Sequence, residues 1–472
     1  MKEVLGKASV FVSELDPLGL LYIAAVVEKS GRPVEVLDAY IEKLGIPEIL
    51  KAIETRRPDV IGISCLTANG AAVYALGRTI KERFKGVKVV LGNIHASVFA
   101  KTYLAHRCAD AVVHGEGEHT FIELLDRFEK DLDLAGVKGI SWWNGEKPVD
   151  NEPRELIADL DDLPMPARHL VDSKKYSLSG LNNFIYVKGR NEEIRQMFTS
   201  RGCVYKCLFC VVHKKYRVRS ARKVVDEMEL LVKNYNAGYI FIMDSLFIAD
   251  KKRVVEICSE IVRRGLKFKW GCEGHINIID EELLRCMEAA GCYEMHFGIE
   301  SGAQHLLDRV SKHTKIDRII EKITMVKTRS KIKVAGLFML GLPGETVADS
   351  MKTIAFAKSL PIDFAQFSIT VPYPGSLLFD QLSGEGKIET GVRKDGSVDL
   401  DIWERYSAHS SFSSNKPIYV TEGMTADELK RMEKLALRSF YLRPRMILSQ
   451  MRRIRPGNLF TVLRAFKSTF LE

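Results

Sequence analysis

Residues 201–210 read RGCVYKCLFC, and this stretch decides how the rest of the chain is interpreted. Cys203, Cys207 and Cys210 have the spacing C-x3-C-x2-C and directly follow a strand-like stretch at 195–199. Cysteine thiolates are the usual ligands of iron–sulfur clusters, and three thiolates this close in sequence can bind one face of a cubane. We therefore predict a [4Fe-4S] cluster on these cysteines, with a fourth iron left open for a cofactor or substrate.

Two other interpretations of the three cysteines stay open at this point. A zinc site would need a fourth ligand, and His213 lies only three residues beyond Cys210. Cysteines that are merely buried as small apolar residues can also cluster by chance. The stretches that surround the motif favour the iron–sulfur interpretation over both.

Strand-like and helix-like stretches alternate from residue 195 onward. The predicted strands are 195–199, 239–243, 267–272, 294–298, 334–339 and 364–369, and the predicted helices between them are 221–235, 250–264, 279–290, 315–328 and 346–358. This alternation predicts a curved parallel sheet, or partial (β/α)6 barrel, over residues 194–376. An active site is then expected at the C-terminal ends of the strands.

An earlier alternation predicts a separate α/β domain over residues 1–130. Its predicted strands are 9–12, 33–37, 59–64, 87–91 and 111–113, with helices at 18–29, before Lys85 and after Glu118. Short connections between such elements predict a doubly wound, Rossmann-like parallel sheet with helices on both faces. Ligands bind at the carboxyl ends of these strands, which here carry residues 64–70, 92–97 and 114–118.

The two remaining regions have weaker patterns. Residues 131–193 form a predicted linker, because 159–166 (DLDDLPMP) has turn chemistry. Residues 377–472 are predicted to be mainly helical, and Thr425 with Glu428 fits a capping box for a helix that runs to about Tyr441.

Composition narrows the class of protein. A hydrophobic content of 46% with 28% charged residues is ordinary for a folded globular chain, and no apolar run approaches the length of a membrane-spanning helix. Nine cysteines are an odd number in a long chain, which argues against a disulfide framework. We expect the other six to be buried apolar residues, and we expect the protein to be cytoplasmic.

The net charge of +9 is concentrated at the end of the chain. Residues 430–472 hold eleven Lys and Arg against two Glu, so they account for all of it. A basic tail can bind nucleic acid or an anionic membrane surface, or can simply be a solvated helical face. No nucleic-acid reading module is recognisable, so nucleic acid is not an expected partner. Apolar residues interleave with the basic ones, so the region is a candidate for peripheral membrane contact.

The cysteine motif, with Phe209 before the last cysteine, resembles the signature of radical S-adenosylmethionine enzymes. Four later stretches resemble motifs of that family in the same order, namely IMDSLF (242–247), FGIESG (297–302), GLFMLGLPGE (336–345) and VPYPGS (371–376). In this family the open iron chelates the amino and carboxylate groups of the methionine part. Reduction of the cluster then yields a 5′-deoxyadenosyl radical, which abstracts a hydrogen atom from an unactivated carbon.

The resemblance also implies roles for particular residues. Asp244 is placed to contact the methionine amino group, and Glu300 and Ser301 the ribose. Leu340 falls in the motif near the adenine. Arg219, with Arg217, is a candidate partner for the methionine carboxylate. Near the barrel mouth, Glu273, His275, His296 and Gln366 are candidate acid or base residues, although a structural role is expected for each, so no general base is assigned.

The N-terminal region resembles the cobalamin-binding domain of cobalamin-dependent radical S-adenosylmethionine enzymes. The resemblance rests on PLGLLYIAA (17–25), PDVIGISCLTANG (58–70), VVLGNIHAS (89–97) and VVHGEGE (112–118). It implies that the corrin and its nucleotide tail are bound by a set of loop residues. These are Ser64, Leu66, Thr67, Gly92, Asn93, His95, Ser97, Gly115 and Glu116.

This sequence departs from the family at two points. Asn93 stands where a second glycine is usual. The D-x-H-x-x-G loop that supplies a histidine to cobalt in other cobalamin proteins is absent. Cobalamin is therefore expected without a protein histidine on cobalt, with the lower face covered by a residue near Leu66 or by water. A degenerate domain that no longer binds cobalamin is the alternative.

The resemblance predicts an enzyme that uses a [4Fe-4S] cluster, S-adenosylmethionine and cobalamin. Its expected reaction is methylation of an unactivated carbon of a small or lipid-like molecule, with electrons from an external flavodoxin- or ferredoxin-type donor. A ring-forming or rearranging enzyme of the same class is one alternative, and a tRNA methylthiotransferase is another. The latter would need three cluster cysteines in the N-terminal domain, where only Cys65 and Cys108 occur. A non-catalytic metal-binding protein with a basic tail is the alternative outside the enzymes.

Overall fold

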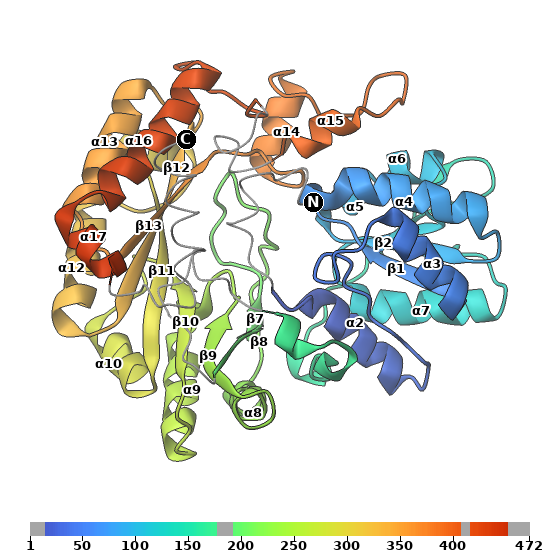
Figure 1. Cartoon of the computed structure of the whole chain (residues 1–472), viewed down its shortest axis with the longest axis horizontal. Coiled ribbons are helices and arrows are strands. Elements are labelled where there is room, and N and C mark those ends of the chain that lie inside the picture. The colour runs from blue at the N-terminus through green and yellow to red at the C-terminus, as the bar shows by residue number, and fades with distance from the viewer. Residues whose placement is uncertain (1–14, 177–191, 407–415, 452–472) are drawn as a thin grey trace. The chain divides into compact units, whose positions relative to one another are not determined.

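The computed structural model of the 472-residue chain describes residues 15–176, 192–406 and 416–451 (Figure 1). The chain folds into two compact units. Unit 1 comprises residues 17–175 and 372–407. Of the described residues, unit 2 comprises 15–16, 176, 192–371 and 416–451. The chain therefore leaves unit 1 within the predicted linker 131–193 and returns to it after the last strand of the second sheet.

Unit 1 is built on a five-stranded sheet of order β1-β2-β3-β4-β5. The strands are β1 (Val60–Ser64), β2 (Lys88–Gly92), β3 (Ala111–Val113), β4 (Ile140–Trp143) and β5 (Pro148–Asp150). The first three are parallel, and β4 and β5 add an antiparallel hairpin within the predicted linker 131–193. The carboxyl ends of β1, β2 and β3 thus meet at one edge, as predicted for a ligand-binding sheet of this class.

Helices cover both faces of the sheet in unit 1, which confirms the doubly wound class. In Figure 1, α4, α5 and α6 lie above the sheet and α2 and α7 below it. The helices are α2 (Leu18–Lys29), α3 (Ile46–Arg56), α4 (Gly70–Arg83), α5 (Ile94–Val98), α6 (Ala100–Ala105) and α7 (Gly117–Glu129), with α14 (Leu377–Gly384) and α15 (Leu400–Glu404) from the returning segment. The strand predicted at 33–37 is wrong within the described residues, since Val34 and Val36 instead pack as coil on Ala24 and Ala25. The strand predicted at 9–12 lies outside the described residues.

Unit 2 contains a six-stranded, wholly parallel sheet of order β13-β12-β11-β10-β9-β6. The strands are β6 (Glu193–Met197), β9 (Ala237–Ile242), β10 (Lys269–Gly274), β11 (Cys292–Glu300), β12 (Lys333–Leu340) and β13 (Phe364–Ile369). All six strands predicted from residue 195 onward are present. Their neighbours in the sheet are their neighbours in the sequence, as in a (β/α) barrel that is not closed.

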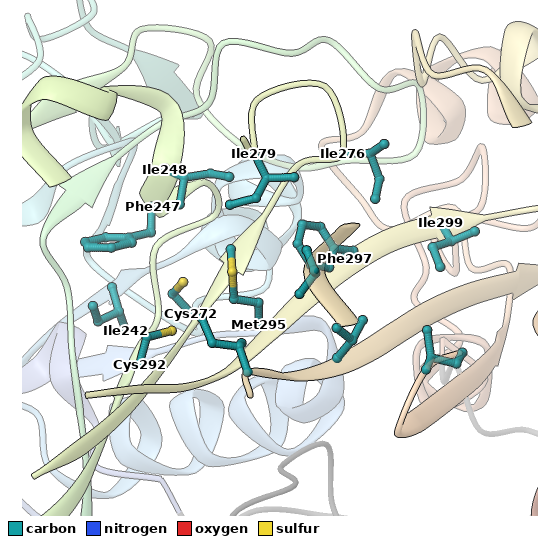
Figure 2. Packing of buried hydrophobic residues seen from close by; sticks show 14 of the residues in the cluster. Ile242, Phe247, Ile248, Cys272, Ile276, Ile279, Cys292, Met295, Phe297 and Ile299 are labelled. Carbon is teal, nitrogen blue, oxygen red and sulfur yellow. The ribbon is translucent and has the colours of Figure 1, made fainter. Parts of the chain in front are cut away.

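The outer face of this sheet carries the main hydrophobic core. Figure 2 shows Met295 of β11 beside Cys272 of β10, with Phe297 and Ile299 further along β11, and all four are buried. The helices whose buried residues complete this core are α8 (Ala221–Asn234), α9 (Lys251–Arg263), α10 (Glu281–Ala289), α12 (Ile316–Arg329), α13 (Val347–Ser359) and α16 (Ala426–Tyr441). Because side chains alternate along a strand, Glu294, His296 and Glu300 fall on the opposite, inner face. The inner face of β11 is therefore polar while its outer face is apolar.

Three elements complete unit 2. The hairpin of β7 (Ser200–Arg201) and β8 (Arg217–Val218) follows β6, and α11 (Gln304–Arg309) follows β11. At the C-terminal side, α16 begins with the predicted capping box between Thr425 and Glu428 and is followed by α17 (Pro444–Met451). Among the described residues, none of the helices has both the length and the apolar character needed to cross a membrane.

Candidate functional site

The cysteine motif lies in the loop between β7 and β8. Ser200 and Arg201 pair with Val218 and Arg217, so the hairpin closes the loop at its base. Inside it, the Cys203 amide donates to the His213 carbonyl at 2.9 Å, and the Cys210 amide to the Cys207 carbonyl at 3.2 Å. Two turns of backbone thus hold the three cysteines on one short, defined loop.

Gly202 makes the close approach at the base of this loop possible. Its φ is +86°, and a Cβ built on it would lie 2.2 Å from the carbonyl oxygen of Lys215. Only glycine combines this conformation with this proximity. The glycine that this conformation requires immediately precedes Cys203, the first cysteine of the motif.

We expect Gly202→Ala to prevent cluster assembly, because the added methyl group must push the two arms of the hairpin apart. The measurement is iron and sulfide per chain after anaerobic reconstitution. Gly396→Ala is the matched control, since Gly396 has a φ of +84° but open space around its Cβ position. Equal iron content in Gly202→Ala and wild type would contradict the prediction.

Asp244 anchors the start of the loop. Its carboxylate accepts the Thr199 amide at 2.6 Å, the Thr199 hydroxyl at 2.5 Å and the Ser200 hydroxyl at 2.6 Å. Arg253 lies 3.9 Å away, and the whole group is buried. Burial raises the pKa of Asp244 although these partners oppose it. The side chain assigned by resemblance to the methionine amino group is thus already engaged by four groups of the chain.

The three cysteines are free thiols with a graded exposure. Cys207 is buried, whereas Cys203 and Cys210 are half-buried. Burial raises the pKa of Cys207, and it raises the pKa of Cys210 to about 11. A bound metal core would deprotonate such thiols, because the thiolate is the ligand.

The geometry disfavours a single zinc ion. Within the described residues, no three His, Cys, Asp or Glu side chains are gathered closely enough to hold one metal ion. Zinc would require this, because Zn–S bonds of about 2.3 Å bring ligand sulfurs within roughly 4 Å of each other. A cubane binds each cysteine to a different iron, so it accepts more widely spaced sulfurs. Three thiolate donors that leave one iron open are the donor set expected for a [4Fe-4S] cluster.

A buried ion pair lies beside the cysteines. Lys312 Nζ is 2.7 Å from Glu300 Oε1, and both residues are more than nine-tenths buried. Burial alone would lower the pKa of Lys312, but the charges of Glu300 and of the Cys207 and Cys210 thiolates raise it. Glu300 has a φ of +64°, at the point where the register between β11 and β12 shifts. Glu300 at the strained end of β11 thus holds the positive charge of Lys312 close to the sulfur ligands.

The cysteine loop also packs on the segment that follows β11. The Leu208 amide donates to the Val310 carbonyl at 3.0 Å, and Leu208 and Phe209 pack against Ala303, Leu306 and Leu342. Ser301 caps this segment, because its hydroxyl accepts the Ala303 amide at 3.1 Å and lies 3.1 Å from the Thr353 hydroxyl. The structure therefore brings the cysteines, Phe209, Glu300 and Ser301 to one end of the sheet.

Two other predicted residues are buried in structural contacts. Arg219 donates to Glu227 at 2.5 Å and to the Phe198 carbonyl at 3.0 Å, and both side chains are buried. The side chain of Leu340 lies in the core on the outer face of the sheet, and its carbonyl accepts the Thr370 amide. A direct contact of either side chain with a cofactor remains a prediction.

The candidate acid and base residues differ in their surroundings. His275 stacks on Tyr205 of the cysteine loop with ring centroids 3.9 Å apart, and burial together with the Lys312 charge lowers its pKa to about 3. His296 lies 3.5 Å from Glu294, which accepts a bond from the Tyr239 hydroxyl. Burial raises the pKa of Glu273, and Gln366 donates to Ser368 on the same strand. We therefore assign His275 a packing role beside the cysteines.

In unit 1, the predicted loop residues gather at the carboxyl ends of β1 and β2. Asn69 accepts the Leu66 amide at 2.8 Å and donates to the Ser64 carbonyl at 3.1 Å. This bonding forms the short 3-10 turn Thr67–Asn69 and leaves Leu66 48% exposed. The turn therefore places Leu66 at this edge of the sheet.

The loop after β2 is held across to β1 and β3. Asn93 donates to the Ser64 hydroxyl at 3.3 Å, accepts the Ile94 amide at 2.8 Å and has a φ of 79°. Ser97 donates to the carbonyls of Asn93 and Val113. A Cβ built on Gly92, or on Gly115 after β3, would meet nothing within 4 Å. The edge thus presents an open, glycine-floored surface to which a ligand backbone or ring can approach closely.

Two of the predicted residues in unit 1 face the protein. Glu116 accepts the Ile157 amide at 2.7 Å. His95 is fully buried against Phe99, Tyr103 and Trp403, and burial lowers its pKa to about 4. The imidazole is therefore neutral and enclosed. His95 is thus enclosed by the protein, and cobalamin bound without a protein histidine on cobalt remains a prediction.

Comparison with known proteins gives two family matches. The B12 binding domain model matches residues 7–125, and the radical SAM superfamily model matches residues 197–357. An uncharacterized methyltransferase of Pyrococcus horikoshii is 30% identical over 92% of this chain and 89% of its own length. The anaerobic magnesium-protoporphyrin IX monomethyl ester cyclase of Rubrivivax gelatinosus is 30% identical over 79% of this chain and 67% of its own.

A solved structure shares the fold. The radical S-adenosylmethionine methyltransferase TsrM of Kitasatospora setae, with cobalamin and a [4Fe-4S] cluster bound, aligns with a TM-score of 0.66. The alignment covers 94% of this chain and 87% of that one at 20% identity. Both units of the present chain therefore have counterparts on one polypeptide.

Proposed function

Because this chain belongs to the radical S-adenosylmethionine enzymes that carry an N-terminal B12-binding domain, we propose that it methylates an unactivated carbon of a small or lipid-like molecule. The observation that carries the proposal is the presence of two ligand sites on one chain. Unit 2 offers three free cysteines at the carboxyl end of a parallel sheet, and unit 1 offers an open edge at Gly92 and Gly115. The bound cofactors supply the bond chemistry, namely a carbon radical from cluster-activated S-adenosylmethionine and a methyl group from methylcobalamin.

The residues of the chain hold and orient these groups. Cys203, Cys207 and Cys210 bind the cluster, and the Lys312–Glu300 pair places balanced charges beside it. Glu300, with its strained backbone, is fixed at the strand end where the resemblance predicts a contact to the ribose. In unit 1, the turn at Leu66 and the loop at Asn93 form the surface for the corrin. The turn and the loops are held by hydrogen bonds within their own unit, which lowers the cost of ordering them when a ligand binds.

Ring formation is the second candidate, and the similarity to the anaerobic cyclase favours it. A cyclase would use the same radical start but would transfer no methyl group. The two functions can be separated without knowing the substrate. A methylase must reload its cobalamin from S-adenosylmethionine, whereas a cyclase need not.

We expect the protein, reconstituted anaerobically with iron, sulfide and hydroxocobalamin, to carry both cluster absorbance and cobalamin bands. After reduction with CD3-labelled S-adenosylmethionine, mass spectrometry should find a deuterated methyl group on the extracted cobalamin together with S-adenosylhomocysteine. 5′-Deoxyadenosine without either product would contradict methylation and favour the cyclase. A cluster without cobalamin bands would mean that unit 1 has lost its ligand.

Three further assignments belong to the proposal. The electron donor is an external flavodoxin- or ferredoxin-type protein, and Lys206, Lys214 and Lys215 are exposed on the cysteine loop where an acidic donor would approach. The protein acts in the cytoplasm. The basic segment 430–472 is proposed to contact membrane surfaces when the substrate is lipid-like, although much of it lies outside the described residues.

A further inference from the structure

The segment between β13 and α16 leaves the barrel unit and joins the B12-binding unit. Residues 372–407 belong to unit 1, whereas 371 and 408 belong to unit 2. The helix α15 of this segment contacts α4 and the 3-10 turn Thr67–Asn69. A stretch from the far end of the sequence thus supports the turn that presents Leu66 and buries Thr67.

Trp403 attaches this segment to the unit. The indole is 1% exposed and donates to the Thr390 carbonyl at 2.9 Å. Its ring lies 4.5 Å from that of His95, 5.1 Å from Phe99 and 5.5 Å from Tyr103, measured between centroids. Aromatic pairs at these separations stabilise a structure beyond what the area they bury contributes. Trp403 therefore ties the returning segment to the helices α5 and α6.

His95, which Trp403 covers, is an unusual residue for such a position. It is fully buried, and neither ring nitrogen has a hydrogen-bond partner among the described residues. Its ring also presses on Gly70 at the start of α4, where a Cβ would come within 2.4 Å of Nε2. A buried imidazole without a partner costs free energy, which persists only where the surroundings hold it. Here those surroundings are the rings of Phe99, Tyr103 and Trp403.

His95 and the 3-10 turn are the two elements on which the cobalamin loops rest. His95 follows Asn93 and precedes Ser97, which bond across to β1 and β3. The turn bonds back to Ser64 through Asn69. Trp403 touches the first element, and its own helix touches the second. Trp403 and the helix that carries it thus contact both loops from within unit 1.

We propose that Trp403 is a positioning residue for cobalamin, acting by holding His95 and the Leu66–Asn69 turn in their binding positions. The inference rests on the proposed function, because it assumes that this edge binds cobalamin. It further means that unit 1 is incomplete without residues 372–407, so that residues 1–175 alone do not form the binding site. Trp403 itself touches no cofactor.

The test uses the full chain loaded with hydroxocobalamin. We expect Trp403→Ala to bind cobalamin about 10- to 100-fold more weakly, as is typical when a group behind a ligand-binding side chain is removed. Trp403→Phe should lose only part of the cobalamin affinity, because it keeps the ring contacts but not the hydrogen bond to the Thr390 carbonyl. The readouts are cobalamin per chain after gel filtration and the dissociation constant from the visible spectrum. Iron per chain, which reports unit 2, should stay at the wild-type value.

Trp143→Ala is the matched control. Trp143 belongs to unit 1 but lies on β4, which pairs antiparallel with β3 so that Trp142 is opposite Ala111 at the start of that strand. It is therefore at the other end of the sheet from the loops, and its loss should leave cobalamin binding unchanged. Equal cobalamin affinity in Trp403→Ala and wild type, with unit 1 intact by limited proteolysis, would overturn the inference. If Trp403→Ala does not fold, Trp403→Phe is compared instead. A partial loss of cobalamin affinity supports the inference, and wild-type affinity overturns it. Wild-type protein that binds no cobalamin would instead refute the proposed function.

Discussion

Replacing Cys207 with serine is expected to leave a protein that binds cobalamin but no iron–sulfur cluster. Cys207 is the most buried of the three ligands, so no other donor or water can readily take its place. A serine hydroxyl of similar size does not deprotonate as a thiol does under metal binding. Iron and sulfide should fall to background, the broad brown absorbance should disappear, and 5′-deoxyadenosine formation should fall below detection. Cobalamin should be retained, because its loops belong to unit 1.

The control for this variant is Cys286→Ser. Cys286 is half-buried on α10 of the same unit, and it is not part of the cysteine loop. We expect it to keep wild-type iron and wild-type cleavage of S-adenosylmethionine. If Cys207→Ser kept a full complement of iron, another ligand would have to be present and the assignment of the site would be wrong. If it lost cobalamin as well, the two units would not be independent in ligand binding.

The parallel sheet of unit 2 and the three parallel strands of unit 1 were predictable because local periodicity and global topology agree, whereas the β4–β5 hairpin was not predicted. Phe364–Ile369 has strand periodicity between two helical stretches, and β13 has the predicted bounds. β11 is longer than predicted, at Cys292–Glu300, because register shifts let it continue past the regular pairing. The prediction of a strand at 33–37 was wrong. Apolar residues alternate there, but among the described residues no neighbouring strand pairs with this stretch.

The cysteine ligands were predictable for a different reason, since all three lie within eight residues of the sequence. The side chains that position the cysteine loop are far apart in the sequence. Lys312 follows Glu300 by twelve residues in a turn with no motif, and Thr199 reaches Asp244 across 45 positions. Trp403 is further still from His95. Side chains that act through long-range packing leave no local pattern, so only the folded structure identifies them.

Lys312→Met is expected to lower both stability and cluster content, because it leaves the Glu300 carboxylate without its partner. Glu300 would then be buried beside the thiolates without its 2.7 Å partner. Breaking a buried ion pair on one side costs about 3–5 kcal/mol, because the remaining charge is uncompensated. We expect a lower melting temperature, less iron per chain, and weaker binding of S-adenosylmethionine. In the molecules that do hold a cluster, EPR-monitored titration should give a more negative reduction potential, since a nearby cation favours the added electron.

Three further variants separate charge balance from simple loss of packing. Lys312→Arg keeps the positive charge and should retain most iron and a near wild-type potential. Lys312→Met with Glu300→Gln removes both charges, and it should recover stability and cluster content because no unpaired charge remains buried. The double variant should still bind S-adenosylmethionine poorly if Glu300 itself contacts the ribose. Lys315→Met, at an exposed lysine in the same turn that pairs with Asp308, should change none of these quantities. A double variant no more stable than Lys312→Met would mean that the lysine stem, and not its charge, supports the site.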